Sequence, residues 1–209
     1  MMQVDPLGLR GVYRLRPKLF PDSRGYFTEI FQQSAFQENV GHRLEVEQVN
    51  CSVSRRGTIR GIHATTVPPG QARYVTCSGG TVLDIVVDVR AGSPTFGQHV
   101  SVELSEEERT IVYLAEGLGH AFAPLTDKAT VIYLCSSGYD PTREVCVNPL
   151  DPALGLPWPT RPEPLLSDKD RAAPTLQEAL ERGLLPSYDS CVARHESLRE
   201  LSRSRTAAP

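Results

Sequence analysis

The chain of 209 residues has 40% hydrophobic side chains, enough to build one domain with a real core and at most a short appendage. Its formal net charge of −3 argues against nucleic acid as the main partner, because binding many phosphates requires a marked basic surplus. No apolar run approaches the roughly 20 residues that span a bilayer, and MMQVDPLGLR at the start lacks the apolar core of a secretory signal, so we expect a cytoplasmic protein without membrane contact.

The first element predicted along the chain is a short peripheral helix. The segment 25–41, GYFTEIFQQSAFQENVG, favours a helix around Gln33 to Asn39 that ends at Gly41, because glycine readily adopts the left-handed conformation found at helix ends. Ser34 is the expected N-cap, since its hydroxyl can accept a hydrogen bond from a free backbone N–H.

Short runs of Val, Ile, Thr and Tyr, separated by Gly, Pro, Asp and Ser, fill the chain up to about residue 160. This pattern is typical of an all-β sandwich or barrel. The clearest strand is TVLDIVVDVR, residues 81–90, in which Leu83, Ile85 and Val87 share one richly apolar face. Further strands are predicted at residues 98–104, 110–114 and 129–137. We expect eight to ten strands in all, a number that suits a jelly roll.

The C-terminal part differs in composition. The proline-dense segment 151–164, DPALGLPWPTRPEP, predicts an ordered, extended connection. A helix is predicted to start after Thr175, with Leu176 and Leu180 at helical spacing, and to end at Gly183. From about Arg194 the chain is charged and is expected to fray. We therefore predict a single domain over residues 1–209, with a core at about 11–160, an extension at about 161–190 and a frayed tail at about 194–209.

A histidine and two arginines stand out in the segment 57–75, GTIRGIHATTVPPGQARYV. Arg60 and His63 are three residues apart and would face opposite sides of an ideal strand. Gly57 and Gly61 bracket Arg60, and glycine within a strand often marks a bulge that reorients side chains. A bulge here would let Arg60 and His63 reach one cavity that binds an anion. Arg73, which follows the Pro-Pro-Gly turn, is the third group in this segment that can be cationic. The alternatives to an anion site are that His63 has a purely structural role and that Arg73 is exposed to solvent.

The second histidine of interest, His120, lies in the glycine-rich turn EGLGHAF between two predicted strands, where structural and functional roles are both open. A metal centre is disfavoured, because three-ligand sites use closely spaced histidines such as H-x-H, and Thr65 occupies that position after His63. The cysteines contain no C-x-x-C pair and are expected to be reduced packing residues. They are Cys51, Cys77, Cys135, Cys146 and Cys191.

Eight motifs in a fixed order carry a family resemblance. They are DSRGYFTE (22–29), EQVNCSVS (47–54), GTIRGIH (57–63), PPGQARYV (68–75), DIVVDVRAGSPTFG (84–97), EGLGHAF (116–122), VIYLCSSGYDP (131–141) and LLSDKD (165–170). From about Gly11 to Tyr188 the chain resembles the nucleotide-sugar 3,5-epimerases related to dTDP-4-dehydrorhamnose 3,5-epimerase. The resemblance implies an all-β, cupin-type jelly-roll sandwich with a C-terminal helical segment, a homodimer that exchanges a strand, no cofactor, and a dTDP-4-keto-6-deoxyhexose as substrate.

The resemblance also implies a mechanism. A ketone at sugar C4 acidifies the hydrogens at C3 and C5, so one base and one acid on opposite faces can invert a centre through an enolate. His63 matches the base, whose ordinary pKa near 6.5 suits proton abstraction at neutral pH. Tyr133 matches the acid, and Asp170 matches the carboxylate that orients the histidine. Arg73 matches a position that is usually lysine and would stabilise the enolate oxygen. Without the resemblance, Tyr133 would be read as an ordinary strand tyrosine.

Substrate-binding positions follow from the same resemblance. Arg24 and Arg60 match contacts to the pyrophosphate and nucleotide, for which guanidinium groups are well shaped. Tyr139 is predicted to stack on the sugar or the base. For Gln48 and Asn50, solvent-facing polar side chains of an edge strand are the alternative interpretation. The remaining binding positions are Glu29, Gln48, Asn50, His120, Glu144 and Lys169.

The chain also departs from the family pattern. Ala64, Thr65 and Thr66 follow the histidine where an aromatic residue is usual, which we expect to remove bulk beside the base, and Pro124 stands in a normally aliphatic stretch. We therefore predict an epimerase that inverts C3, C5 or both in a deoxysugar pathway. A 3,4-ketoisomerase of the same fold and a non-catalytic nucleotide-sugar-binding protein are the two alternatives.

Overall fold

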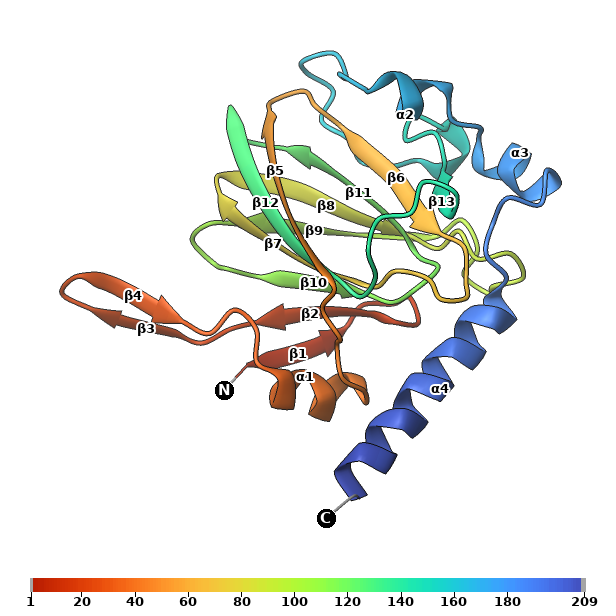
Figure 1. Cartoon of the computed structure of the whole chain (residues 1–209). Coiled ribbons are helices and arrows are strands. Elements are labelled where there is room, and N and C mark those ends of the chain that lie inside the picture. The colour runs from red at the N-terminus through yellow and green to blue at the C-terminus, as the bar shows by residue number, and fades with distance from the viewer. Residues whose placement is uncertain (1, 208–209) are drawn as a thin grey trace.

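Two facing antiparallel sheets form the body of the protein, as seen in a computed structural model that describes residues 2–207 (Figure 1). The six-stranded sheet has the order β1-β2-β10-β7-β12-β5 and the five-stranded sheet the order β13-β6-β11-β8-β9. The first comprises β1 (Gln3–Pro6), β2 (Val12–Arg16), β5 (Gln48–Arg55), β7 (Arg73–Gly79), β10 (Ile111–Leu114) and β12 (Lys128–Cys135). The second comprises β6 (Arg60–Thr65), β8 (Thr81–Val87), β9 (His99–Ser105), β11 (Gly119–Pro124) and β13 (Glu144–Cys146). The predicted all-β sandwich is confirmed.

The core has two parts, one on each side of the five-stranded sheet. Between the sheets, Val82 and Val86 of β8 pack in a cluster with residues of both sheets. On the outer side, Ile85 and Val87 of the same strand pack against C-terminal residues such as Leu176. Full burial of such a side chain contributes about 1.5–3 kcal/mol. β8 is thus largely buried on both faces, because the C-terminal connection covers the face that would otherwise meet solvent.

Both predicted helices, α1 and α3, are present, and one predicted cap was wrong. α1 (Gln33–Val40) ends at Gly41, whose φ of 94° is left-handed, as predicted. Its N-cap is Gln32, which makes no side-chain cap bond, so the assignment of Ser34 was wrong and that residue lies inside the helix. α3 (Leu176–Glu181) begins after Thr175 as expected, because Thr175 and Glu178 form a reciprocal capping box. The short α2 (Asp168–Ala172) was not predicted.

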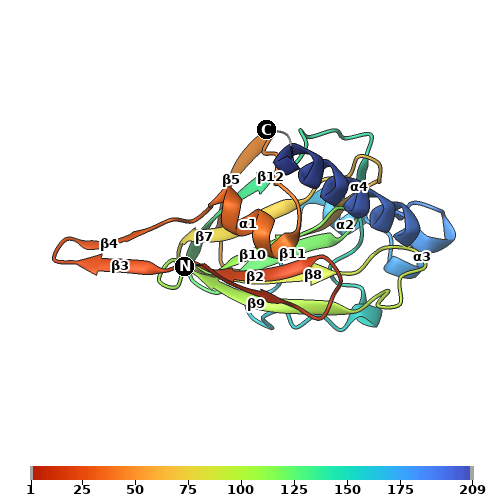
Figure 2. The same ribbon diagram turned by 90° about the horizontal axis from the view of Figure 1, so that it is seen from below.

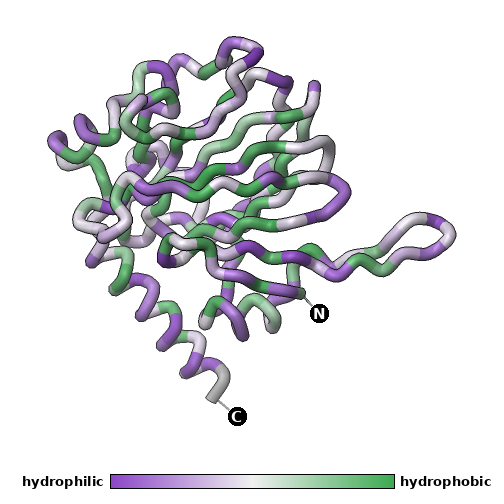
Figure 3. The backbone as a smooth tube through the Cα atoms, turned by 180° about the vertical axis from the view of Figure 1, so that it is seen from behind, coloured by the Kyte–Doolittle hydropathy of each residue, from purple (hydrophilic) through white to green (hydrophobic). Residues whose placement is uncertain are grey.

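The tail that the sequence led us to expect as frayed is instead part of α4 (Tyr188–Ala207), which lies beside α1 below the sandwich (Figures 1 and 2). Its buried stripe is polar: Cys191, His195 and Ser202 recur at helical spacing. Figure 3 shows continuous hydrophobic stretches in the sandwich strands, whereas hydrophilic residues predominate along α4. The apolar periodicity that would have predicted this helix is therefore missing.

A pair of buried histidines fixes α4 to the sandwich. Nε2 of His195 lies 3.2 Å from Nε2 of His42, and Nδ1 of His42 lies 2.8 Å from the carbonyl oxygen of Arg43. Burial, together with His42 and nearby arginines, lowers the pKa of His195 to about 3, and burial also lowers the pKa of His42. Both rings are therefore neutral at pH 7, and His42 donates Nδ1–H to the carbonyl and accepts at Nε2.

A hairpin projects from the body of the molecule. It consists of β3 (Leu19–Asp22) and β4 (Gly25–Thr28) and extends away from the sandwich in both ribbon views (Figures 1 and 2). Phe27 on β4 is 67% exposed, an unusual position for a large apolar side chain. Among the described residues 2–207, no helix is long and apolar enough to cross a membrane.

Candidate active site

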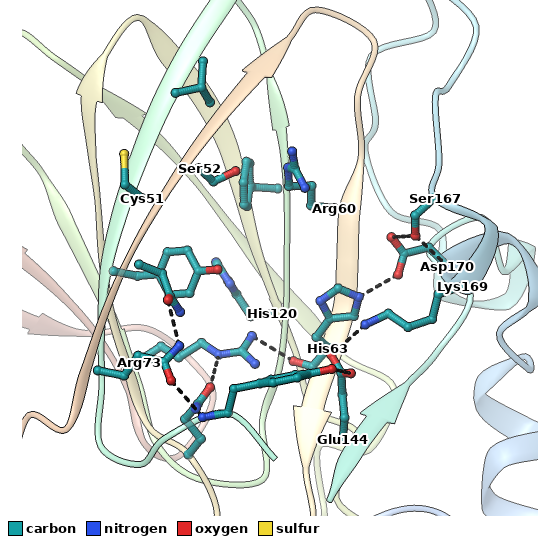
Figure 4. Close-up of a pocket in the computed structure, with 17 residues that line it drawn as sticks. Cys51, Ser52, Arg60, His63, Arg73, His120, Glu144, Ser167, Lys169 and Asp170 are labelled. Atoms are coloured by element: carbon teal, nitrogen blue, oxygen red, sulfur yellow. Dashed lines mark hydrogen bonds and ion pairs between the residues drawn. The ribbon is translucent and has the colours of Figure 1, made fainter. Parts of the chain in front are cut away.

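A cavity of about 770 Å³ opens between the two sheets, with walls from both of them and from α2 (Figure 4). Of the residues predicted from the sequence as site residues, all line this cavity except Arg24 and Glu29. The lining residues are Gln48, Asn50, Cys51, Ser52, Val53, Arg60, His63, Gln71, Arg73, His120, Phe122, Tyr133, Tyr139, Glu144, Ser167, Lys169 and Asp170.

The predicted bulge in β6 is present and explains how Arg60 and His63 reach one cavity. In the pairing of β6 with β11, His63 lies opposite His120 and Arg60 opposite Phe122, so three steps on β6 match two on β11. Gly61 sits within the bulge with φ of 107°, and a Cβ there would collide with the carbonyl oxygen of His120. Only glycine fits this position.

His63 and Asp170 form a hydrogen-bonded pair on one wall of the cavity. Nε2 of His63 lies 2.6 Å from Oδ1 of Asp170, which is 3% exposed, and Ser167 donates to its other carboxylate oxygen at 2.8 Å. Burial raises the pKa of Asp170, but the His63 and Ser167 hydrogen bonds and the nearby charges lower it by more. Asp170 is therefore a carboxylate that accepts from Nε2–H, which leaves Nδ1 of His63 with a free lone pair.

A second pair of the same kind lies next to the first. Nε2 of His120 lies 2.7 Å from Oδ2 of Asp84, and both side chains are buried. Oδ1 of Asp84 has no hydrogen-bond partner within residues 2–207. His120 is the Cα partner of His63 across β11 and β6, so the two imidazoles neighbour each other. The sequence did not predict Asp84 as a site residue, although a carboxylate alternating with buried aliphatic residues in TVLDIVV was a usable signal.

Arg73 brings a positive charge to the cavity without a carboxylate partner. Its Nη1 donates to the carbonyl oxygen of His63 and its Nε to Oε1 of Gln71, both at 3.1 Å. No ion pair involves Arg73 in the part of the chain that the structure describes. Burial lowers the pKa of its guanidinium, yet arginine remains charged at neutral pH. The arrangement holds a fixed cation beside the first histidine.

Tyr133 comes from the opposite wall. It lies on β12 of the six-stranded sheet, paired with Asn50 of β5, whereas His63 lies on β6 of the five-stranded sheet. Both residues line the same cavity. A ligand between the sheets would therefore have an imidazole on one side and a phenol on the other.

A network of polar side chains closes one side of the cavity mouth. Nζ of Lys169 donates to Oε1 of Glu144 at 2.8 Å, and the Tyr139 hydroxyl donates to Oε2 at 3.2 Å. The backbone N–H of Tyr139 in turn donates to Gln48. Burial raises the pKa of Glu144, but the hydrogen bond and charge of Lys169 and the hydrogen bond from Tyr139 help to lower it overall, so it remains ionised. The network joins α2, β13 and β5 across the opening.

Three residues named in the sequence analysis do not line this cavity, and the binding roles of Arg24 and Glu29 stay predictions. Arg24 lies at the hairpin tip, 88% exposed and paired with Asp22, and Glu29 follows the hairpin, so neither reaches the cavity of its own chain. Ala64 is buried in the outer cluster with Ile62 and does not border the cavity. The prediction that it removes bulk beside the base was wrong, because consecutive strand residues point to opposite faces.

The amino-acid sequence is similar to a known protein family and to several of its members. The sequence profile of the family described as dTDP-4-dehydrorhamnose 3,5-epimerase matches residues 6–178. A dTDP-4-dehydro-6-deoxyglucose 3-epimerase from a Streptomyces species is 54% identical over 90% of this chain and 95% of its own. A dTDP-4-dehydrorhamnose 3,5-epimerase from Mycolicibacterium smegmatis is 50% identical over 95% of this chain and 98% of its own.

Solved structures give the same result. ChmJ, a 3′-monoepimerase from Streptomyces bikiniensis solved with dTDP-quinovose, has a TM-score of 0.90 and 52% identity, covering 93% of this chain and 98% of its own. The rmlC epimerase of Mycobacterium tuberculosis has a TM-score of 0.92 and 43% identity, covering 94% of this chain and 100% of its own.

Proposed function

This chain belongs to the dTDP-4-dehydrorhamnose 3,5-epimerase family, and on that premise we propose that it inverts C3, C5 or both in a dTDP-4-keto-6-deoxyhexose during deoxysugar biosynthesis. It is an isomerase of the epimerase type. One observation carries the mechanism: the His63–Asp170 pair and Tyr133 line facing walls of one cavity. The relative ChmJ was solved with dTDP bound to a double mutant and with dTDP-quinovose bound, which supports a dTDP-sugar as the ligand.

The first step is proton abstraction. The ketone at C4 makes the C3 and C5 hydrogens acidic, and Nδ1 of His63 takes one of them while Asp170 holds the ring through Nε2–H. The electrons of the broken C–H bond move toward the C4 oxygen and give an enolate. The Arg73 guanidinium stabilises that negative charge, since a preorganised charge aimed at the developing oxyanion is usually the largest catalytic contribution.

The second step returns a proton from the other side. Tyr133 donates its phenolic proton to the carbon from the opposite face of the sugar, which inverts the centre and collapses the enolate to the ketone. The tyrosinate then recovers its proton from solvent, and the imidazolium loses one to solvent, so that no net proton is consumed. The binding roles proposed for Gln48, Asn50, Arg60 and His120 draw support from their place on the cavity wall.

Incorporation of solvent deuterium tests this function. Incubation of the enzyme with dTDP-4-keto-6-deoxyglucose in D₂O is expected to label C3, C5 or both, and NMR of the recovered sugar counts the deuterium at each carbon. The label count decides between inversion at C3 alone and inversion at both centres, because a 3-epimerase and a 3,5-epimerase are similar to this chain to a comparable degree. A carbonyl moved from C4 to C3 would identify a ketoisomerase, and absence of label would leave only a binding protein.

A second copy of the chain is proposed to complete the site. Arg24 and Glu29 cannot reach the cavity of their own chain, and the hairpin that carries them exposes Phe27. The edge strand β5 exposes Val49 and Val53, 60% and 52% respectively, next to the cavity. A homodimer that lays the hairpin of one copy against the other would cover this surface. Light scattering is expected to give the mass of a dimer, and Phe27→Asp is expected to shift it toward the monomer. A monomeric wild-type enzyme with full activity would contradict the proposal.

The compartment proposed for the reaction is the cytoplasm. All five cysteines are free thiols. Free thiols persist where glutathione and thioredoxin keep cysteine reduced. Fractionation of cells that produce the protein at native level tests the assignment.

A further inference from the structure

Three side chains with donor atoms suited to a metal ion lie together beside the cavity. A ring nitrogen of His63, a carboxylate oxygen of Glu144 and Sγ of Cys146 all lie within 4.8 Å of one another. Cys146 has no place in the reaction proposed above. This cluster was not predicted from the sequence, because His63 lies more than 80 residues before Glu144 and Cys146 and only strand pairing joins the two segments.

The register of two strands creates the cluster. β13 pairs with β6 in antiparallel orientation, with Cys146 opposite His63 and Glu144 opposite Thr65. Residues 144 and 146 are two apart on one strand, so they share a face with His63. Side chains opposite each other across a strand pair have Cβ atoms about 4.5–5.5 Å apart. The positions of the three ligands are therefore determined by the sheet rather than by a flexible loop.

The donor set selects a particular class of metal. Thiolate, imidazole and carboxylate are the ligands of Zn²⁺, at about 2.0–2.3 Å, and three of them with one open position form a common tetrahedral arrangement. The thiolate favours soft and borderline ions, whereas Mg²⁺ and Ca²⁺ prefer sites built from oxygen. Zn²⁺ and its softer relative Cd²⁺ are therefore the ions that match.

We propose that His63, Glu144 and Cys146 form an inhibitory site for Zn²⁺ or Cd²⁺. The metal would bind the imidazole that serves as the base and so block proton abstraction. Binding breaks the S–H bond of Cys146, forms a sulfur–metal bond and releases the proton to solvent, with no change of oxidation state. Lys169, which donates to Glu144, has a side chain that is 49% exposed, so its ammonium can move into solvent when the divalent ion enters.

Metal titration of matched cysteine variants tests the site. Cys51 lines the same cavity from β5 and is exposed, so Cys51→Ser is the control for Cys146→Ser. CdCl₂ added to the wild-type enzyme is expected to produce one equivalent of thiolate-to-Cd²⁺ charge-transfer absorbance per chain. The band is expected to persist in Cys51→Ser and to be lost in Cys146→Ser.

Inhibition by ZnCl₂ gives the second readout, and this arm alone depends on the proposed epimerase activity. Without metal, both variants are expected to turn over like wild type. Loss of a ligand is expected to raise the half-inhibitory zinc concentration of Cys146→Ser at least about tenfold, while Cys51→Ser matches wild type. Cys146→Ala provides the same test if the serine variant does not fold.

The proposed site is overturned if the wild-type enzyme shows no cadmium band or if the band persists in both Cys146→Ser and Cys146→Ala. It is also overturned if zinc inhibits the wild-type enzyme and the variants equally. If the enzyme proves inactive on the keto-sugar, the absorbance result still decides whether the metal binds.

Discussion

His63→Ala is expected to slow deuterium incorporation at the sugar carbons by about 10²–10⁴-fold, the usual contribution of a positioned base. Nδ1 of His63 is the free ring nitrogen, because Nε2 is held by Asp170. Truncation is not expected to unfold the protein, since the imidazole lines an open cavity and is not packed in either core cluster. The measurement is the NMR-detected exchange rate in D₂O with dTDP-4-keto-6-deoxyglucose, alongside the melting temperature.

Asp170→Asn tests whether exchange requires the correct protonation of His63 and not only the presence of its imidazole. An amide N–H at this position can donate to Nε2 of His63, which would move the ring proton to Nδ1 and remove the lone pair from the cavity. Exchange is therefore expected to fall strongly although the imidazole is still there, as when the orienting carboxylate of a hydrolase triad is replaced. Exchange at the wild-type rate in His63→Ala would remove this residue from the base role, whatever Asp170→Asn does.

The sequence predicted the parts of the site that local patterns specify. Gly57 and Gly61 around Arg60 indicated a bulge, and the bulge is there because the close approach of β11 excludes any Cβ at residue 61. The helix start after Thr175 and the glycine end of α1 were equally local and equally visible. Each of these features depends on one residue's conformational or hydrogen-bonding chemistry.

The features that the sequence did not predict depend on tertiary partners. α4 has a polar buried stripe, and its pairing with His42 connects residues 153 positions apart. Asp84 became part of the site only through the register of β8 with β11, which brings it to His120. The position of Ala64 was misjudged because family likeness says which residue follows the histidine but not which side of the sheet it faces.

Arg73→Met is expected to lower kcat by about 10²–10³-fold, the typical loss when one oxyanion-stabilising group is removed. Methionine keeps an unbranched apolar stem but removes the charge and the hydrogen bonds to His63 and Gln71. The measurement is steady-state kcat and KM on dTDP-4-keto-6-deoxyglucose. The loss should appear mainly in kcat, because the enolate charge develops after the substrate has bound.

Arg73→Lys provides the control that separates charge from hydrogen bonding. Lysine restores a cation at the cavity wall but cannot reproduce the planar fork that contacts both the His63 carbonyl and Gln71. If charge on the enolate is what matters, the lysine variant should recover most of the activity that methionine loses. Equal losses in both variants would show instead that Arg73 acts by holding the β6 backbone and Gln71 in place, and near-wild-type kcat in Arg73→Met would remove it from enolate stabilisation altogether.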